Sequence, residues 1–145
     1  MNDQLVHDER DGLLLSTDRA RIDLEAVLAM LHASHWGGTM SRPLLERAVE
    51  NSLCIGVYAG SEQLAFARAV TDLATYAYLT DVIVAEHARG RGIGSWIVAT
   101  IIAHPDLQGL RRIALLTRDA RGLYEKFGFT TTMPVSTYME RRGAR

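Results

Sequence analysis

Hydrophobic residues recur at helical spacing in two segments near the start of the chain. Each segment follows a residue suited to capping a helix, Asp23 in the first case and Ser41 in the second, where Pro43 also fits a first helical turn. A glycine-containing break, residues 34–40, separates them. The sequence therefore predicts two amphipathic helices, whose apolar positions are Val27, Leu28 and Leu31, and then Leu44, Leu45, Ala48 and Val49.

Apolar runs of strand length make up most of the remaining pattern. Residues 53–59 and 63–70 flank a Gly-Ser-Glu turn, which indicates a hairpin. Helical patterns return at 95–103 and 120–127, and the second ends at Gly128. The element order predicts an α+β fold with about four helices and a mixed, mostly antiparallel sheet of six to seven strands. The other expected strands are residues 12–16, 77–85, 112–117, 129–131 and 137–140.

Composition places the chain among soluble globular proteins, with 48% hydrophobic and 23% charged residues. Its 145 residues suit one domain, 1–145, with a mobile start (1–11) and end (141–145). The formal charge of −1 does not favour nucleic-acid or membrane-surface binding. The single cysteine, Cys54, excludes an internal disulfide, and the histidines form no metal-ligand pattern, so we expect no metal. With no signal-like start and no long apolar run, a cytoplasmic protein is expected.

Residues 89–94 read Arg-Gly-Arg-Gly-Ile-Gly and lie between a predicted strand and a predicted helix. Glycines let the backbone approach a ligand closely, and the start of a helix presents N–H groups without partners. Two arginines add charges suited to phosphate oxygens. This segment, called the glycine turn below, therefore predicts a site for a phosphate-bearing cofactor.

Two common phosphate motifs do not fit the glycine turn. A nucleotide P-loop needs a lysine, and the only lysine of the chain is Lys126. A dinucleotide fingerprint needs a third glycine where this chain has Ser95 or Ile97. The pattern that does fit is R-x-x-G-x-G, formed by Arg89, Gly92 and Gly94.

With that pattern, and with Leu-Tyr-Glu-Lys-Phe-Gly-Phe at 123–129, the chain resembles the GCN5-related N-acetyltransferases, the GNAT family, from about residue 12 to residue 139. The resemblance implies acetyl-CoA as co-substrate and direct acetyl transfer to an amine in a ternary complex. It implies that the strands before and after the glycine turn splay apart to admit coenzyme A. It also implies that Tyr124 contacts the cofactor and protonates the departing thiolate. The cofactor-binding residues that it implies are Val82, Ile83 and Val84 through their backbone, Arg89, Gly90, Arg91, Gly92, Ile93, Gly94 and Ser95, and Thr117, where many members carry Asn.

Asp81 is a charged residue within an apolar strand. Strict alternation places it opposite Val82 and Val84, and on a different face from Tyr78 and Thr80. It is a candidate to bind a substrate ammonium or to act as the general base. Hydrogen bonding to neighbouring backbone and exposure at a sheet edge are the structural alternatives.

Three further residues are candidates for acceptor binding. Arg68, in another apolar strand, can pair with a substrate carboxylate, or with Asp72 or Asp81. His35 and Trp36 lie in the break between the first two helices, where they can stack on an amine or an aromatic group or pack down as a lid.

The favoured function is N-acetylation of the primary amine of a small molecule. A protein N-terminus or lysine is a second class of acceptor. A non-catalytic coenzyme A-binding sensor or interaction module is the alternative to an enzyme. A homodimer is also left open.

Overall fold

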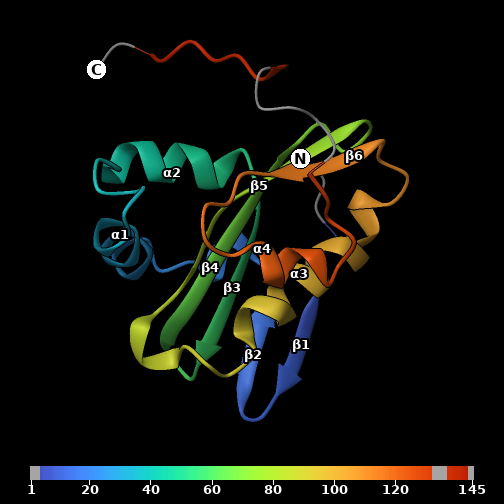
Figure 1. The fold of residues 1–145 in the computed structure, drawn as a ribbon. Helices are drawn as coiled ribbons and strands as arrows, with labels where there is room; N and C mark the ends of the chain where they lie inside the picture. The colour runs from blue at the N-terminus through green and yellow to red at the C-terminus, as the bar shows by residue number, and fades with distance from the viewer. Residues whose placement is uncertain (1–3, 132–136, 144–145) are drawn as a thin grey trace.

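A six-stranded mixed sheet forms the centre of the computed structural model, which describes residues 4–131 and 137–143. Strand order along the sheet follows the chain, β1 to β6 (Figure 1). Neighbouring strands are antiparallel except β5 and β6, which are parallel. The predicted α+β fold is confirmed. The strands are β1 (His7–Arg10), β2 (Leu13–Ser16), β3 (Leu53–Ala59), β4 (Glu62–Thr71), β5 (Tyr76–Val84) and β6 (Arg112–Leu115).

Helices cover both faces of the sheet (Figure 1). On one face, α1 (Leu24–Ala33) and α2 (Arg42–Glu50) enclose a core that includes Phe66 and Ile83. On the other, α3 (Ile93–Ala103) and α4 (Arg121–Glu125) pack over a larger core. Short 3-10 helices lie at Arg19–Arg21 (η1), Glu86–Ala88 (η2) and Pro105–Leu107 (η3). None of the described helices combines the length and apolarity needed to cross a membrane.

The predicted starts of α1 and α2 are confirmed. The Asp23 carboxylate accepts from the Ala26 N–H at 3.1 Å, and the Ser41 hydroxyl accepts from the Leu44 N–H at 3.3 Å. One predicted core position is wrong, because Leu44 is 53% exposed. Successive helical residues point about 100° apart, so burying Leu45 turns Leu44 toward solvent.

Three terminal segments differ from the prediction. Residues 7–10, expected to be mobile, form β1 and pair with β2. Because β1 is an edge strand of polar residues, it has no apolar alternation to reveal it. Residues 129–131 and 137–140 form no strand, and 132–136 lie outside the described residues. The end segment 141–143 has no assigned helix or strand.

A β-bulge interrupts the pairing of β4 and β5. Phe66 pairs with Ile83 and Arg68 with Thr80, so two residues of β5, Asp81 and Val82, oppose the single residue between them on β4. Asp81 takes a left-handed conformation, with φ of 53°. Residues of β5 after the bulge therefore point to the opposite face from the one that alternation predicts.

Candidate functional site

The glycine turn joins β5 to α3 through η2. Gly90 and Gly92 have φ values of 82° and 77°, in the left-handed region that side chains disfavour. Gly92 is the residue that caps α3, and the Trp96 N–H donates to its carbonyl at 3.1 Å. The glycines thus allow the chain to reverse sharply and start a helix at once.

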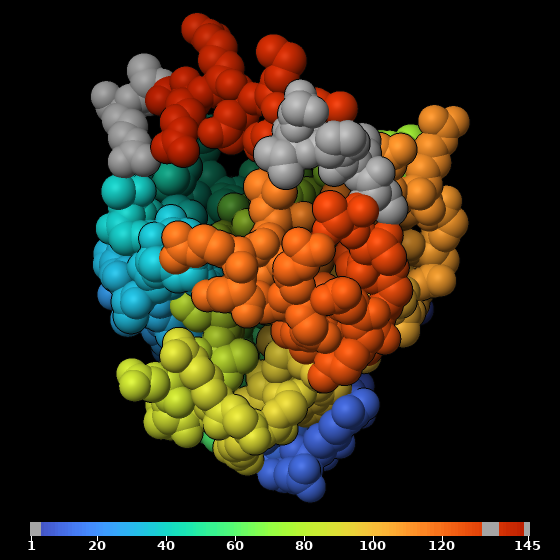
Figure 2. Space-filling view, in the orientation of Figure 1, coloured from blue at the N-terminus to red at the C-terminus, as the bar shows by residue number. Residues whose placement is uncertain are grey.

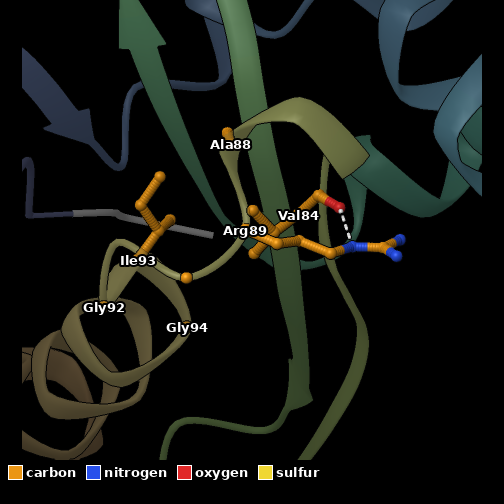
Figure 3. A pocket seen from close by; sticks show the side chains of 7 residues that line it. Val84, Ala88, Arg89, Gly92, Ile93 and Gly94 are labelled. Carbon is orange, nitrogen blue, oxygen red and sulfur yellow. Dashed lines mark hydrogen bonds between the residues drawn. The ribbon is translucent and has the colours of Figure 1, made fainter.

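No side chain among the described residues caps the start of α3. The first-turn N–H groups of Ile93, Gly94 and Ser95 have no helical partner and form no hydrogen bond within the described residues. Ile93 and Gly94 border a hollow of about 110 Å³ between the glycine turn and Val84 (Figure 3). Unpaired donors at the positive end of a helix suit a phosphate, so this chain's backbone fits the pyrophosphate of a cofactor.

The two arginines of the glycine turn differ in direction. Arg89 donates from Nε to the Val84 carbonyl oxygen at 3.2 Å, and its guanidinium points away from Gly92 and Gly94 (Figure 3). Arg91 is exposed and lines a second hollow beside Gly92. Arg89 therefore lines the first hollow with its guanidinium turned away from the glycines, whereas Arg91 lines the second hollow.

The second hollow, of about 430 Å³, was not foreseen from the sequence because one wall comes from β1. Arg10 of β1 lies with its guanidinium carbon 5.1 Å from the centre of the Trp96 ring, in cation–π geometry. Asp8 accepts from the Trp96 indole N–H at 2.8 Å and pairs with Arg10 at 3.3 Å. The residues lining this hollow are Arg10, Asp11, Leu13, Arg91, Gly92, Ile93 and Trp96.

The pairing of β5 with β6 ends well before β5 does. Leu79 opposite Leu115 is the last pair, whereas β5 continues to Val84. Beyond Leu79, the β6 side of β5 has no paired strand among the described residues. This divergence agrees with the splay that the resemblance implies, and it leaves the backbone at 82–84 beside the glycine turn.

Tyr124 of α4 is buried on the α3 side of the sheet. Its ring meets Phe129 edge to face, with centroids 5.9 Å apart. Its neighbour Leu123 packs against the start of α3, 3.5 Å from where a Cβ on Gly94 would lie. In the space-filling view, the yellow segment leading to α3 and the orange segment leading to α4 are exposed on the same face of the molecule (Figure 2).

Burial raises the pKa of the Tyr124 phenol, which keeps it protonated at neutral pH. Its hydroxyl forms no hydrogen bond within the described residues and so remains a free donor. Thr117, before α4, accepts from the Ala120 N–H at 3.0 Å. Its own hydroxyl hydrogen remains available to a ligand.

Asp81 and Arg68 form an ion pair, with Arg68 Nε 2.6 Å from Asp81 Oδ2. Of the partners considered for Arg68, the structure thus selects Asp81. Strict alternation predicts that Asp81 and Thr80 lie on different faces of the sheet, and this prediction is wrong. Because of the bulge, Asp81 lies on the same face as Thr80, the residue paired with Arg68. Its placement opposite Val82 and Val84, which pack in the α3-side core, agrees with the prediction.

His35 and Trp36 lie in the loop between α1 and α2. Their rings meet edge to face with centroids 4.8 Å apart, and Trp36 is 49% exposed. No hydrogen bond or ion pair joins them to Arg68 or Asp81 within the described residues. The structure therefore leaves them as an exposed pair on the α1–α2 side.

Comparison with known proteins finds acetyltransferases both among protein families and among individual relatives. The family described as Acetyltransferase (GNAT) domain matches residues 50–131. Putative acetyltransferase FG08082 of Gibberella zeae is 32% identical over 140 residues, which cover 81% of this chain and 78% of that protein.

Solved structures resemble the whole described fold. A GNAT-family protein from Xanthomonas campestris pv. campestris is 40% identical, with a TM-score of 0.86, and the match covers 93% of this chain and 96% of that one. Glucosamine-6-phosphate N-acetyltransferase from Arabidopsis thaliana has a TM-score of 0.65 at 14% identity, over 90% and 97% of the two chains. At that identity the likeness concerns the fold alone.

Proposed function

The chain belongs to the GNAT family of acetyltransferases, and we propose that it transfers the acetyl group of acetyl-CoA directly to the primary amine of a small molecule. GNAT enzymes in general use acetyl-CoA and act on an acceptor, so the chain is an acyltransferase. The choice of a small amine over a protein lysine or N-terminus is our proposal.

The observation that carries this proposal is the uncapped start of α3 beside the unpaired end of β5. The N–H groups of Ile93, Gly94 and Ser95 would hold the cofactor pyrophosphate, with Arg91 nearby. Acetyl-CoA supplies an activated thioester. A main-chain N–H from 82–84 would stabilise the negative charge that develops on the thioester oxygen, and a donor of this kind contributes about 3–4 kcal/mol.

Tyr124 is proposed to donate a hydrogen bond to the departing sulfur. A phenol has an ordinary pKa near 10 and a thiol one of about 8.5, so full proton transfer to the thiolate is uphill. Burial raises the pKa of Tyr124 further above that of a thiol. Steadying the sulfur with a retained proton is therefore the larger part of the role we assign to it.

Asp81 and Arg68 are proposed to hold the acceptor. They are charged side chains within the sheet, on the face opposite the core of α3. A general-base role for Asp81 stays a prediction, because its carboxylate is already bound by Arg68.

The first test is calorimetric titration of the purified protein with acetyl-CoA, with ADP in parallel. Micromolar binding of acetyl-CoA, much tighter than that of ADP, is expected. Release of coenzyme A thiol with a panel of primary amines should follow, and Tyr124→Phe should reduce it. Tyr58→Phe, which removes a buried hydroxyl beside Arg21 and Asp18, is the matched control. Binding without thiol release from any amine or peptide would identify a coenzyme A-binding module in place of an enzyme.

A further inference from the structure

The ion pair of Arg68 and Asp81 lies within the sheet, with side chains only 16% and 7% exposed. Arg68 also donates from Nη1 to the Ser52 hydroxyl at 3.3 Å. Removing two charges from water is unfavourable, and a buried ion pair is often no more stabilising than apolar residues of the same volume. Fold stability is therefore a weak reason for this pair to be here.

Both partners have unused hydrogen-bonding capacity. A guanidinium carries five N–H donors and a carboxylate accepts about four hydrogen bonds. Arg68 makes two such bonds and Asp81 accepts one from a side chain within the described residues. Among the described residues, the only fully buried side-chain nitrogen or oxygen atoms without a hydrogen-bond partner are the Tyr58 hydroxyl and His104 Nε2. No atom of Arg68 or Asp81 is therefore both fully buried and unpaired. The free N–H groups of Arg68 and the second oxygen of Asp81 are thus open to a ligand.

An apolar surface continues from the ion pair toward the β4–β5 hairpin. Val70 pairs with Tyr78, and both lie on the same sheet face as Arg68 and Thr80. Tyr76, two residues before Tyr78, points to that face as well. Val70 and Tyr76 are 44% and 41% exposed, so this end of the face is not covered as Phe66 and Ile83 are by α1 and α2.

The pKa of Tyr78 supports the same arrangement. Burial raises this pKa most, and Tyr76, the Asp81 carboxylate and the Glu140 carboxylate of the end segment raise it further, while Arg68 opposes the shift. The phenol thus lies within electrostatic reach of both charges of the pair.

We infer that Arg68 and Asp81 bind a free α-amino acid as its zwitterion, the carboxylate on Arg68 and the ammonium on Asp81. An apolar or aromatic side chain of this amino acid would lie along Val70, Tyr76 and Tyr78. The inference rests on the proposed function, since this amino acid would be the acetyl acceptor. Charge complementarity selects it, because a plain amine or a peptide N-terminus brings no carboxylate for Arg68.

The transfer balances without any further reactant. The bound ammonium loses one proton to water, and its nitrogen forms a bond to the thioester carbonyl carbon. The carbon–sulfur bond breaks, and the departing sulfur receives the second proton from nitrogen. The products are an N-acetyl amino acid, free coenzyme A thiol and one proton released to solvent.

Thiol release by the unmodified protein with three matched acceptors tests the inference. These are phenylalanine, phenethylamine, which lacks the carboxylate, and phenylalaninamide, which mimics the start of a peptide. We expect kcat/KM for phenylalanine to exceed both others by about 10- to 100-fold, since neither of the others offers a carboxylate to the free N–H groups of Arg68. Equal values, or a preference for phenylalaninamide, would overturn the inference while leaving acetyl transfer intact.

Two variants and a binding measurement complete the experiment. Arg68→Gln should abolish the preference for phenylalanine, whereas Arg47→Gln, an exposed arginine of α2, should keep it. A preference unchanged in folded Arg68→Gln contradicts the assignment. Calorimetric titration with phenylalanine and phenethylamine does not depend on turnover. Selective binding of phenylalanine without thiol release would support the inference and reject the proposed function.

Discussion

The indole N–H of Trp96, in α3, donates to the Asp8 carboxylate of β1 at 2.8 Å, and so joins the first strand to the helix that follows the glycine turn. The same carboxylate pairs with Arg10, whose guanidinium lies over the Trp96 ring. These three side chains hold the edge strand against the start of α3.

Replacing Trp96 by Phe should therefore loosen β1 more than β2. Hydrogen–deuterium exchange should show faster exchange at the β1 amides that pair with β2, with β4 unaffected. Equal protection of β1 in both proteins would mean that pairing with β2 alone holds this strand.

The same variant has a defined pH dependence. The hydrogen bond from Trp96 is the largest cause of the lowered pKa of Asp8. A lowered pKa in the folded state stabilises the protein above the ordinary value of 3.8, and this contribution is lost as the pH falls through the lower value. The stability difference between wild type and Trp96→Phe should thus shrink in acid, as measured by denaturant unfolding.

Tyr124→Phe removes only the hydroxyl and keeps the packing against Phe129. If the hydroxyl donates a hydrogen bond to the departing sulfur, kcat should fall by about 10- to 100-fold, while the affinity for acetyl-CoA stays close to that of wild type. A fall of about 10²–10⁴ would indicate full general acid catalysis. Steady-state kinetics with calorimetric binding separates the two effects. Near-normal kcat would leave Tyr124 as a packing residue.

Gly92→Ala places a side chain on a residue with φ of 77°. An L-residue adopts this left-handed conformation at a cost of about 1–2 kcal/mol in folding free energy. No atom of the described residues lies within 4 Å of the added Cβ, so the loss of stability should come from the backbone alone. Binding of acetyl-CoA should weaken as well, because the methyl group lies at the phosphate hollow. Gly38→Ala is the control, with no neighbour within 4 Å and no left-handed φ.

The two arginines of the glycine turn should differ in their effect on cofactor binding. Arg91→Ala should weaken acetyl-CoA binding by about 1.5–3 kcal/mol, the range of hydrogen bonds to charged groups. Arg89→Ala should weaken it less, because Arg89 donates to the Val84 carbonyl and points away from the helix start. A larger loss in Arg89→Ala would show that its side chain turns to the cofactor on binding.

Tyr58→Phe should stabilise the protein. The Tyr58 hydroxyl is buried and lacks a partner within the described residues, a situation that costs about 1–3 kcal/mol. Gly56→Ala should have the opposite effect, because its Cβ would lie 2.2 Å from that hydroxyl. Thermal unfolding of the two variants gives the comparison.

The buried phenol of Tyr58 should also make the folded protein less stable at alkaline pH. Burial raises its pKa above the ordinary 10.0, so above that pH the unfolded phenol ionises while the folded one stays neutral. Stability should therefore fall as the pH rises past 10, and the fall should be smaller in Tyr58→Phe.

Local signals explain what could be predicted from the sequence. The capping residues Asp23 and Ser41 and the glycines at 90 and 92 each fix the backbone within a few residues, and the structure agrees with them. The family resemblance added Tyr124 and the divergence of β5 from β6, neither of which a local pattern specifies.

Features that depend on pairing between distant segments could not be predicted. The bulge at Asp81 arises from the register between β4 and β5, and no residue type marks it. β1 is stabilised by β2 and Trp96, not by apolar residues of its own. The direction of Arg89 is set by the carbonyl of Val84, a backbone atom that is the same in every residue.

The bulge at Asp81 adds one residue to β5 and so shifts the alternation of side chains between the two sheet faces by one position. Ala77 and Leu79 before it, and Val82 and Val84 after it, all pack on the α3 side, although an odd number of steps separates the two sets. One strand can thus supply apolar side chains to the same layer along its whole length and still turn one carboxylate into the opposite layer. Deleting Asp81 would leave two steps between Leu79 and Val82, so regular alternation would keep Val82 and Val84 on the α3 side. The extra residue of the bulge is thus dispensable for the apolar layers, and what it adds to the strand is the carboxylate.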